Sequence, residues 1–212
     1  ARQTVHLGKA LTAADFEIEA PEGANSARVR VIGVVENQAP TEALVKELPV
    51  IDGLVEGEGG TCQIALVERH RATGGVVNAF VSGFNYEGRM AMASTVAHDS
   101  HHMIVVGTDA DNMALAANHL RALGGGITIF KDGTELATID LPIAGLMSDS
   151  PAHEVASKTD AMMQAMRDCG CTLNNAYMQH SLLALVVIPE LRISDLGLVD
   201  VRTFEFMDVI VS

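Results

Sequence analysis

A short run of side chains that can bind metals or transfer protons is the main chemical feature of this sequence. Three histidines and one aspartate fall within residues 98–102 (HDSHH), directly after an apolar run that ends at Ala97. Neutral imidazole and carboxylate are common ligands of divalent transition metals, and imidazole transfers protons near neutral pH. Folding alone gives no reason to gather such groups at the end of a buried strand. The run therefore predicts a functional site.

A second polar segment, Glu68-Arg69-His70, also follows a short apolar strand. Along a regular strand His98 and Asp99 face opposite sides, so the histidine segment must turn, or partners must come from elsewhere. If the two strands are neighbours, we expect Glu68 and His70 to approach His98 and Asp99. One interpretation is a metal site or a polar wall facing a substrate. The other is a hydrogen-bonded strand end with one or two exposed histidines.

Composition excludes several classes of protein. The chain has 212 residues and a net charge of −13, which would repel a phosphate backbone, so no nucleic-acid partner is expected. No apolar stretch approaches the roughly 20 residues of a membrane span, and the first residues lack the apolar core of a secretory signal. Three cysteines cannot all pair with one another, which favours free thiols and a cytoplasmic location.

The surrounding pattern predicts an α/β (or α+β) fold: one layered domain over residues 1–212, with a mixed β-sheet and two to three packed helices. A helix is expected between Thr108, as its N-cap, and Gly124, as its C-cap, and another from Ser150 to just before Gly170. We read the glycines 124–126 as a helix cap and turn, since they follow a helix instead of preceding one. Strands are expected at 27–36, 63–68, 76–84, 103–107, 127–131, 135–141 and 201–211, and 90–97 is a small apolar segment.

Several segments together resemble one family, the C-terminal domain of bacterial adenine deaminases in the amidohydrolase superfamily. Five motifs occur in the order of that family and span nearly the whole chain: VERHR with TG at 67–74, TVAHDSH at 95–101, IVVG at 104–107, LPIAGLMS at 141–148, and IPEL with GLVDV at 188–201. The family usually reads HDSHN where this chain has His102. That difference concerns the local shape of the pocket wall.

The resemblance implies hydrolytic deamination of adenine to hypoxanthine and ammonia, a step of purine salvage. It implies a divalent metal, Mn or Fe, with Zn as an alternative, held mainly by an N-terminal barrel. No segment here carries the HxH ligands of that barrel. The implied partners are adenine, the N-terminal barrel portion of the same enzyme and, in a homo-oligomer, further copies. This chain would supply a cap, an interface or a pocket wall, and would be inactive alone.

Residue roles follow from this picture as hypotheses. His98 and Asp99 are candidate catalytic residues, on the substrate side or in proton transfer. Ser100 and Glu68 are candidate substrate contacts. The candidate accessory metal ligands are His70, His98 and His101.

Two other hypotheses stay open: a non-catalytic assembly domain and an independent accessory metal-binding domain. A methionine stripe, Met162, Met163 and Met166, suits a helix at a subunit contact, although methionine more often fills gaps in a core. The remaining histidines, His6, His119, His153 and His180, are expected to be structural or solvated.

Overall fold

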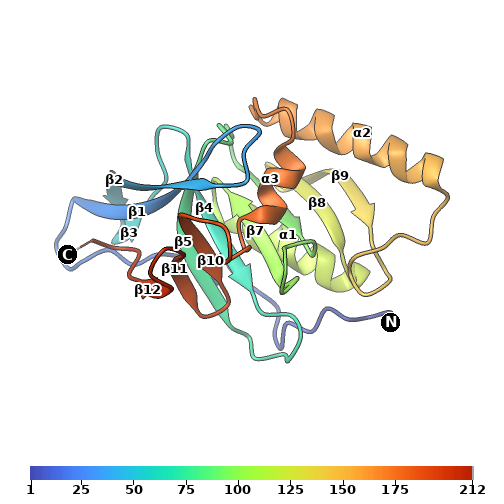
Figure 1. Ribbon diagram of the computed structural model, residues 1–212, viewed down its shortest axis with the longest axis horizontal. Helices are drawn as coiled ribbons and strands as arrows, with labels where there is room; N and C mark the ends of the chain where they lie inside the picture. The colour runs from blue at the N-terminus through green and yellow to red at the C-terminus, as the bar shows by residue number, and fades with distance from the viewer. Residues whose placement is uncertain (212) are drawn as a thin grey trace.

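The computed structural model describes residues 1–211, and its centre is a mixed nine-stranded sheet (Figure 1). The strand order is β3-β2-β1-β5-β4-β7-β6-β8-β9, and all neighbours are antiparallel except the parallel pair β1 and β5. A three-stranded sheet, β10-β11-β12, packs beside it. The strands are β1 (Ser26–Val34), β2 (Thr41–Ile51), β3 (Leu54–Val55), β4 (Thr61–Val67), β5 (Val76–Ser82), β6 (Met90–Ser94), β7 (Met103–Gly107), β8 (Gly126–Lys131), β9 (Thr134–Asp140), β10 (Leu191–Ser194), β11 (Gly197–Asp200) and β12 (Glu205–Met207). The expected layered α/β fold is confirmed.

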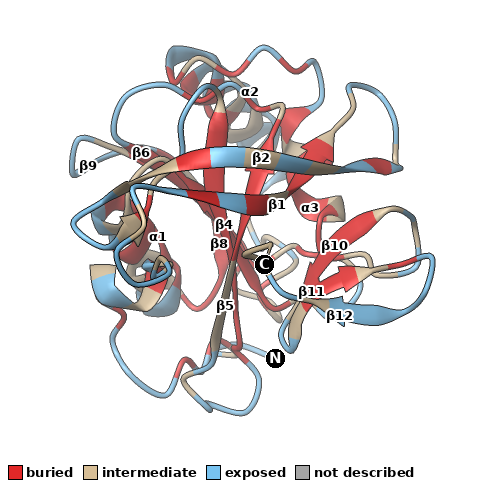
Figure 2. Ribbon diagram, turned by 90° about the vertical axis from the view of Figure 1, so that its left-hand side faces the viewer, coloured by how far each residue is buried: buried red, intermediate tan, exposed pale blue. Residues whose placement is uncertain are grey.

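The three central strands β4, β6 and β7 are buried along their whole length. Apart from Gln63 in β4, whose side-chain amide donates to the Phe16 carbonyl oxygen, they consist of aliphatic, methionine and small residues with no charge, as expected of strands covered on both faces. One face packs against helix α1 (Ala110–Leu123) and the 3₁₀ turn η1 (Ala13–Phe16). The other face packs against α2 (Ala152–Asp168), α3 (Ala176–Leu182) and the small sheet. Figure 2 shows the resulting buried centre between these layers.

Two helix starts differ from the sequence prediction by one or two residues. The N-cap of α1 is Asp109, whose carboxylate accepts from the Asn112 backbone N–H, whereas the Thr108 hydroxyl donates to the carbonyl oxygen of Gly88. Helix α2 begins after Pro151 instead of at Ser150. The C-cap prediction is confirmed, because Gly124 has a φ of 83° and its N–H donates to the Leu120 carbonyl.

The stripe on α2 belongs to the domain core. Met162 and Met166 are buried against the sheet, and Met163 is partly buried beside them. This placement favours gap-filling over a subunit contact for the methionine stripe. Cys62, Cys169 and Cys171 are buried free thiols, as the odd cysteine count predicted.

One strand prediction was wrong. The segment 201–211 forms only the short β12, preceded by a turn and followed by a single bridge from Ile210 to Val29. Its alternating pattern does not produce a longer strand because the chain leaves the small sheet after Met207 and crosses to β1, where Arg30 donates its backbone N–H to Val209. No helix within residues 1–211 is both long and apolar enough to cross a membrane.

Candidate functional site

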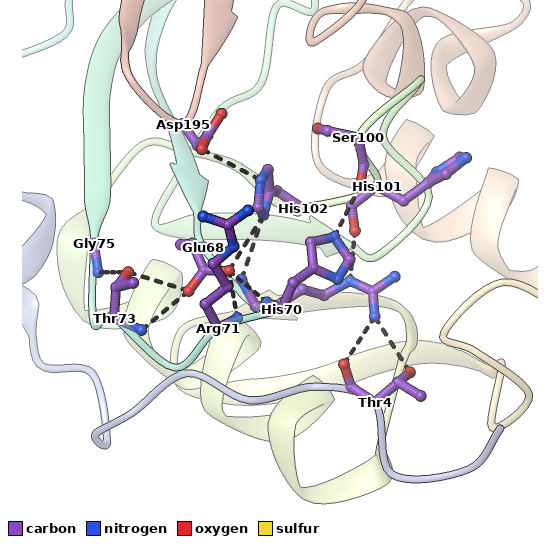
Figure 3. Close-up of polar contacts among 11 residues, drawn as sticks. Thr4, Glu68, His70, Arg71, Thr73, Gly75, Ser100, His101, His102 and Asp195 are labelled. Carbon is purple, nitrogen blue, oxygen red and sulfur yellow. Dashed lines mark hydrogen bonds and ion pairs between the residues drawn. The ribbon is translucent and has the colours of Figure 1, made fainter.

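The two polar segments meet because strands β4 and β7 are neighbours. The last residue of β4, Val67, pairs with Met103 at the start of β7 and with Val76 at the start of β5. The segment after β4 therefore lies beside the segment before β7 and the one before β5. Figure 3 shows this junction, with Glu68 and His70 on one side and Ser100 to His102 on the other.

Glu68 organises the turn between β4 and β5. Its Oε1 accepts from the backbone N–H groups of His70 (2.5 Å) and Arg71 (2.8 Å), and its Oε2 accepts from the N–H (3.0 Å) and hydroxyl (3.1 Å) of Thr73. Burial would raise the pKa of Glu68, but these hydrogen bonds outweigh it and lower the pKa to about 2. All four acceptor positions of the carboxylate are occupied. This arrangement supports a role in shaping the loop.

Arg69 connects the junction to the rest of the domain. Its side chain is buried and donates to three backbone carbonyl oxygens: His101 (2.5 Å), Thr4 (3.1 Å) and Ala144 (3.1 Å). The guanidinium packs directly on Gly145, where a Cβ atom would lie 2.9 Å from a guanidinium nitrogen. Segments far apart in the sequence, including two of the motifs that carry the resemblance, therefore meet at one side chain.

His70 is exposed and has a defined tautomer. Its Nε2 lies 2.8 Å from the carbonyl oxygen of Ser100. Because a carbonyl oxygen only accepts, Nε2 carries the proton and Nδ1 of the neutral ring is left as an acceptor. The ring of His70 is tilted over that of His102, with centroids 4.7 Å apart.

His102 is the buried histidine of the run. Its Nδ1 accepts from the Arg69 backbone N–H (3.4 Å), and its Nε2 lies 3.5 Å from the Oδ2 atom of Asp195. Asp195 sits in the turn between β10 and β11 (Figure 3). Burial lowers the pKa of His102, and the nearby Asp195 carboxylate acts in the opposite direction. The ring is therefore neutral at physiological pH, with its proton directed at Asp195.

The other candidates of the histidine run lie together, away from Glu68. The ring centroids of His98 and His101 are 5.1 Å apart. Asp99 and Ser100 form an exposed turn between them. His101 Nδ1 accepts from the Ala97 backbone N–H at 3.2 Å, and burial followed by the charge of His98 lowers the pKa of His101. The expected approach of Glu68 and His70 to His98 and Asp99 is thus replaced by contacts to Ser100 and His102. The physical reason is that β7, not the strand preceding His98, pairs with β4.

The three proposed accessory metal ligands are not gathered into one set. His70 faces His102, whereas His98 and His101 face each other. Within residues 1–211 no group of three or more His, Cys, Asp or Glu side chains is arranged to hold a metal ion. The accessory metal site therefore remains a prediction without a preformed ligand set in this chain.

The junction opens into a cavity of about 480 Å³. Five of its lining residues lie outside the two polar segments that the sequence singled out: Arg71, Thr73, Gly75, Asp195 and Leu196. Arg71 and Thr73 belong to the turn whose backbone N–H groups Glu68 binds, so the prediction of a site at Glu68 already indicated this turn. No signal in the sequence connected Asp195 and Leu196 to the histidines. The full lining is Glu68, His70, Arg71, Thr73, Gly75, His102, Asp195 and Leu196.

The remaining unusual histidine is His180 in α3. It is completely buried, and neither ring nitrogen has a hydrogen-bond partner among the described residues. Burial lowers the pKa of His180 to about 3, so the ring is neutral. Its ring packs edge-on against the Phe84 ring, with the ring centroids 6.1 Å apart. His180 is therefore part of the core, consistent with the expectation of a structural role.

Comparison with known proteins gives the family. The adenine deaminase C-terminal domain family matches residues 38–205. The chain is 77% identical over its whole length to an adenine deaminase of Roseobacter denitrificans, and 72% identical over 211 residues to one of Paracoccus denitrificans. It is 44% identical over 211 residues, 99% of its length, to an adenine deaminase of Moorella thermoacetica. In each case it spans 35% of the relative's length. The chain belongs to the adenine deaminase C-terminal domain family, as the sequence resemblance predicted.

Proposed function

We propose that this chain is the C-terminal part of an enzyme that converts adenine and water to hypoxanthine and ammonia, in purine salvage. The proposal rests on the family match and on relatives that carry the name adenine deaminase. Because the chain spans about a third of their length, the remaining two thirds supply the rest of the active enzyme. A homo-oligomeric state and a cytoplasmic location remain predictions from the sequence.

The observation that carries a role for this chain in the reaction is the polar cavity at the junction of β4, β5 and β7. Three separate segments meet there: the Glu68-bound turn with His70, His102 before β7, and Asp195 between β10 and β11. The cavity offers an acceptor at His70 Nδ1 and a carboxylate at Asp195. These groups suit hydrogen bonds to the N–H groups of a purine or its leaving amine. We place the pocket wall here and assign substrate contact to His70, with Glu68 as the residue that positions it.

The candidates from the histidine run, His98, Asp99 and Ser100, have a narrower role in this proposal. Ser100 acts on the cavity through the backbone carbonyl that orients His70, whereas His98 and Asp99 are not among the lining residues. A direct catalytic part for His98 or Asp99 requires the rest of the enzyme to bring adenine to this exposed turn.

The implied divalent metal does not fit the residues of this chain. Since residues 1–211 contain no group of three suitable ligands, we assign Mn or Fe, or Zn as the alternative, to the preceding part of the enzyme. The residues of this chain contribute by binding and orienting groups.

Complementation tests the proposal. The polypeptide that carries this chain is prepared complete, without residues 1–212, and without them but mixed with this chain as a separate protein. Ammonia release from adenine is expected from the complete enzyme, is expected to fall at least ~100-fold on truncation, and is expected to recover on mixing, because binding and positioning contribute several kcal/mol to catalysis. A folded truncated enzyme with full activity would show that this chain is an assembly domain instead.

A further inference from the structure

A second cavity, on the α1 side of the large sheet, is lined by acidic side chains that the proposed reaction does not use. Its volume is about 310 Å³, within the range of small-molecule sites. Four carboxylates line it, those of Glu17, Glu56, Asp109 and Asp111, and none of the described lining residues is basic. We call it the acidic cavity. Its charge favours a cationic occupant over an anionic one.

Separate segments of the fold hold the walls of the acidic cavity in place. Asn118 of α1 exchanges two hydrogen bonds, of 3.0 and 2.8 Å, with the backbone just before η1. The segment after η1 is tied to β3, because Val55 donates its backbone N–H to the Ile18 carbonyl oxygen at 2.8 Å. Glu17 and Glu56 are the sequence neighbours of these two residues, so the contact brings both carboxylates to one cavity. The acidic cavity is therefore built by the fold itself.

The four carboxylates are not equally compensated. Arg89 lies 2.9 Å from an Asp111 carboxylate oxygen and 3.4 Å from one of Asp109, so these two share a cation. Within residues 1–211, neither Glu17 nor Glu56 has a hydrogen-bond or ion-pair partner for its carboxylate. Burial, followed by the charges of Glu17 and Asp109, raises the pKa of Glu56. The two glutamates therefore present uncompensated negative charge to the cavity.

A buried amide gives an indication of a ligand that is independent of the carboxylates. Gln63 lies in the fully buried strand β4 and is only 8% exposed. Its Nε2 donates to the Phe16 carbonyl oxygen at 2.7 Å, which fixes the orientation of the amide. Its Oε1 has no hydrogen-bond partner among the described residues, and Gln63 lines the acidic cavity. Because a buried carbonyl oxygen without a donor costs free energy, this position calls for an N–H or O–H group in the cavity.

The arrangement suits an organic cation better than a metal ion. No three His, Cys, Asp or Glu side chains within residues 1–211 are close enough to one point to hold a metal. An ammonium or guanidinium group instead carries several N–H donors that reach acceptors on different sides. The amide oxygen and the two glutamates provide only acceptors, which matches a group that is only a donor.

We propose that the acidic cavity binds a small organic cation that carries a primary ammonium or guanidinium group. Its N–H groups donate to Gln63 Oε1 and to the carboxylates of Glu17 and Glu56, and these charge-assisted hydrogen bonds supply the affinity. The acidic cavity shares no lining residue with the cavity beside His70. The inference therefore goes beyond the proposed function and does not depend on it.

Calorimetric titration of the complete polypeptide that carries this chain tests the site. The probes are putrescine and agmatine, with 1,4-butanediol as the neutral counterpart of putrescine and calcium chloride as the metal, all at one ionic strength. The variants are Glu17→Gln, Glu56→Gln and Gln63→Met. Glu58→Gln is the matched control, because it removes the same charge two residues from Glu56 at an exposed position that does not line the cavity. Melting temperatures show which variants are folded.

We expect at least one of the two cations to bind with a Kd below ~1 mM, and the diol to bind at least ~10-fold more weakly. Each of the three variants should weaken the cation at least ~10-fold, and Glu58→Gln should change it less than ~2-fold. If Gln63→Met does not fold, the two glutamate variants decide, since neither side chain is fully buried.

Four results would overturn the inference. They are no binding of either cation, equal binding of the diol, an equal loss in Glu58→Gln, and calcium binding without amine binding. A folded Gln63→Met variant with wild-type affinity would overturn it as well, because general attraction to an acidic surface would then explain the binding.

Discussion

Replacing Glu68 with glutamine tests whether this carboxylate holds the candidate site together. The change preserves size but removes the charge, and the new amide nitrogen must face two donors, either the N–H groups of His70 and Arg71 or the two Thr73 donors. The pKa of Glu68 falls from an ordinary 4.5 to about 2, a difference of about 2.5 pH units. Linkage converts that difference to about 3 kcal/mol in favour of the folded state at pH 7.

The pH dependence fixes the sign of this contribution. A carboxyl group whose pKa is depressed on folding stabilises the folded state above its unfolded pKa of 4.5, and that stability is lost as the pH falls toward about 2. We therefore expect Glu68→Gln to lower the free energy of unfolding by about 2–3 kcal/mol at pH 7, and by about 2 kcal/mol less at pH 3.

Chemical denaturation of the wild type and Glu68→Gln at pH 7 and pH 3 measures both quantities. Glu190→Gln is the matched control, because Glu190 pairs with the exposed side chain of Arg202 at the surface. Surface pairs contribute about 1 kcal/mol or less, so this control should change little. A loss below about 0.5 kcal/mol for Glu68→Gln, or an equal loss at both pH values, would refute the reasoning.

Three further predictions concern groups around the site and in the core. Arg69→Met should lower the free energy of unfolding by about 3 kcal/mol or more, because the carbonyl oxygens of His101, Thr4 and Ala144 lose their common donor; urea denaturation measures it, and an unchanged midpoint would contradict it. His180→Leu should raise stability by about 1–2 kcal/mol at pH 7, because it removes a buried ring without partners among the described residues. The wild type should also lose stability as the pH falls from 6.5 toward about 3, because the unfolded chain binds a proton at His180 that the buried ring does not; the His180→Leu variant should lose less, and parallel melting curves over that range would argue against this. Gly125→Ala should cost at least about 3 kcal/mol, because φ is +127° and the new Cβ would lie 2.4 Å from the Gly145 Cα; a melting temperature equal to that of the wild type would refute it.

Much of the fold could be predicted because the central strands have uniform apolar sequences. The strands β4, β5, β7 and β8 appear within about two residues of their expected positions, since buried strands carry apolar runs that few other structures explain. β2 was not predicted. Its eleven residues are half exposed and include Glu42, Lys46, Glu47 and Pro49, so neither an apolar run nor a clean alternation marks it.

The candidate site was predicted in part. Glu68, His70 and the histidine run were identified because polar groups after buried strands are unusual, and the structure places these segments side by side. The pairing within the site was not predicted, because register decides it: β4 pairs with β7, so His102 meets Glu68 and His98 does not. Asp195 was missed because its contact depends on how a distant hairpin docks, and a lone aspartate in a turn carries no sign of that.

The most direct test of a functional cavity is the catalytic efficiency of the complete enzyme when His70 is replaced by alanine. His70 is exposed, so the fold should tolerate the change. His119→Ala is the control, because His119 is a partly exposed histidine of α1 that lies outside the cavity. We predict that kcat/KM for adenine deamination falls at least ~10-fold in His70→Ala and stays near the wild-type value in His119→Ala, with melting temperatures unchanged. Equal kcat/KM values for both variants and the wild type would contradict the assignment of this cavity to the reaction.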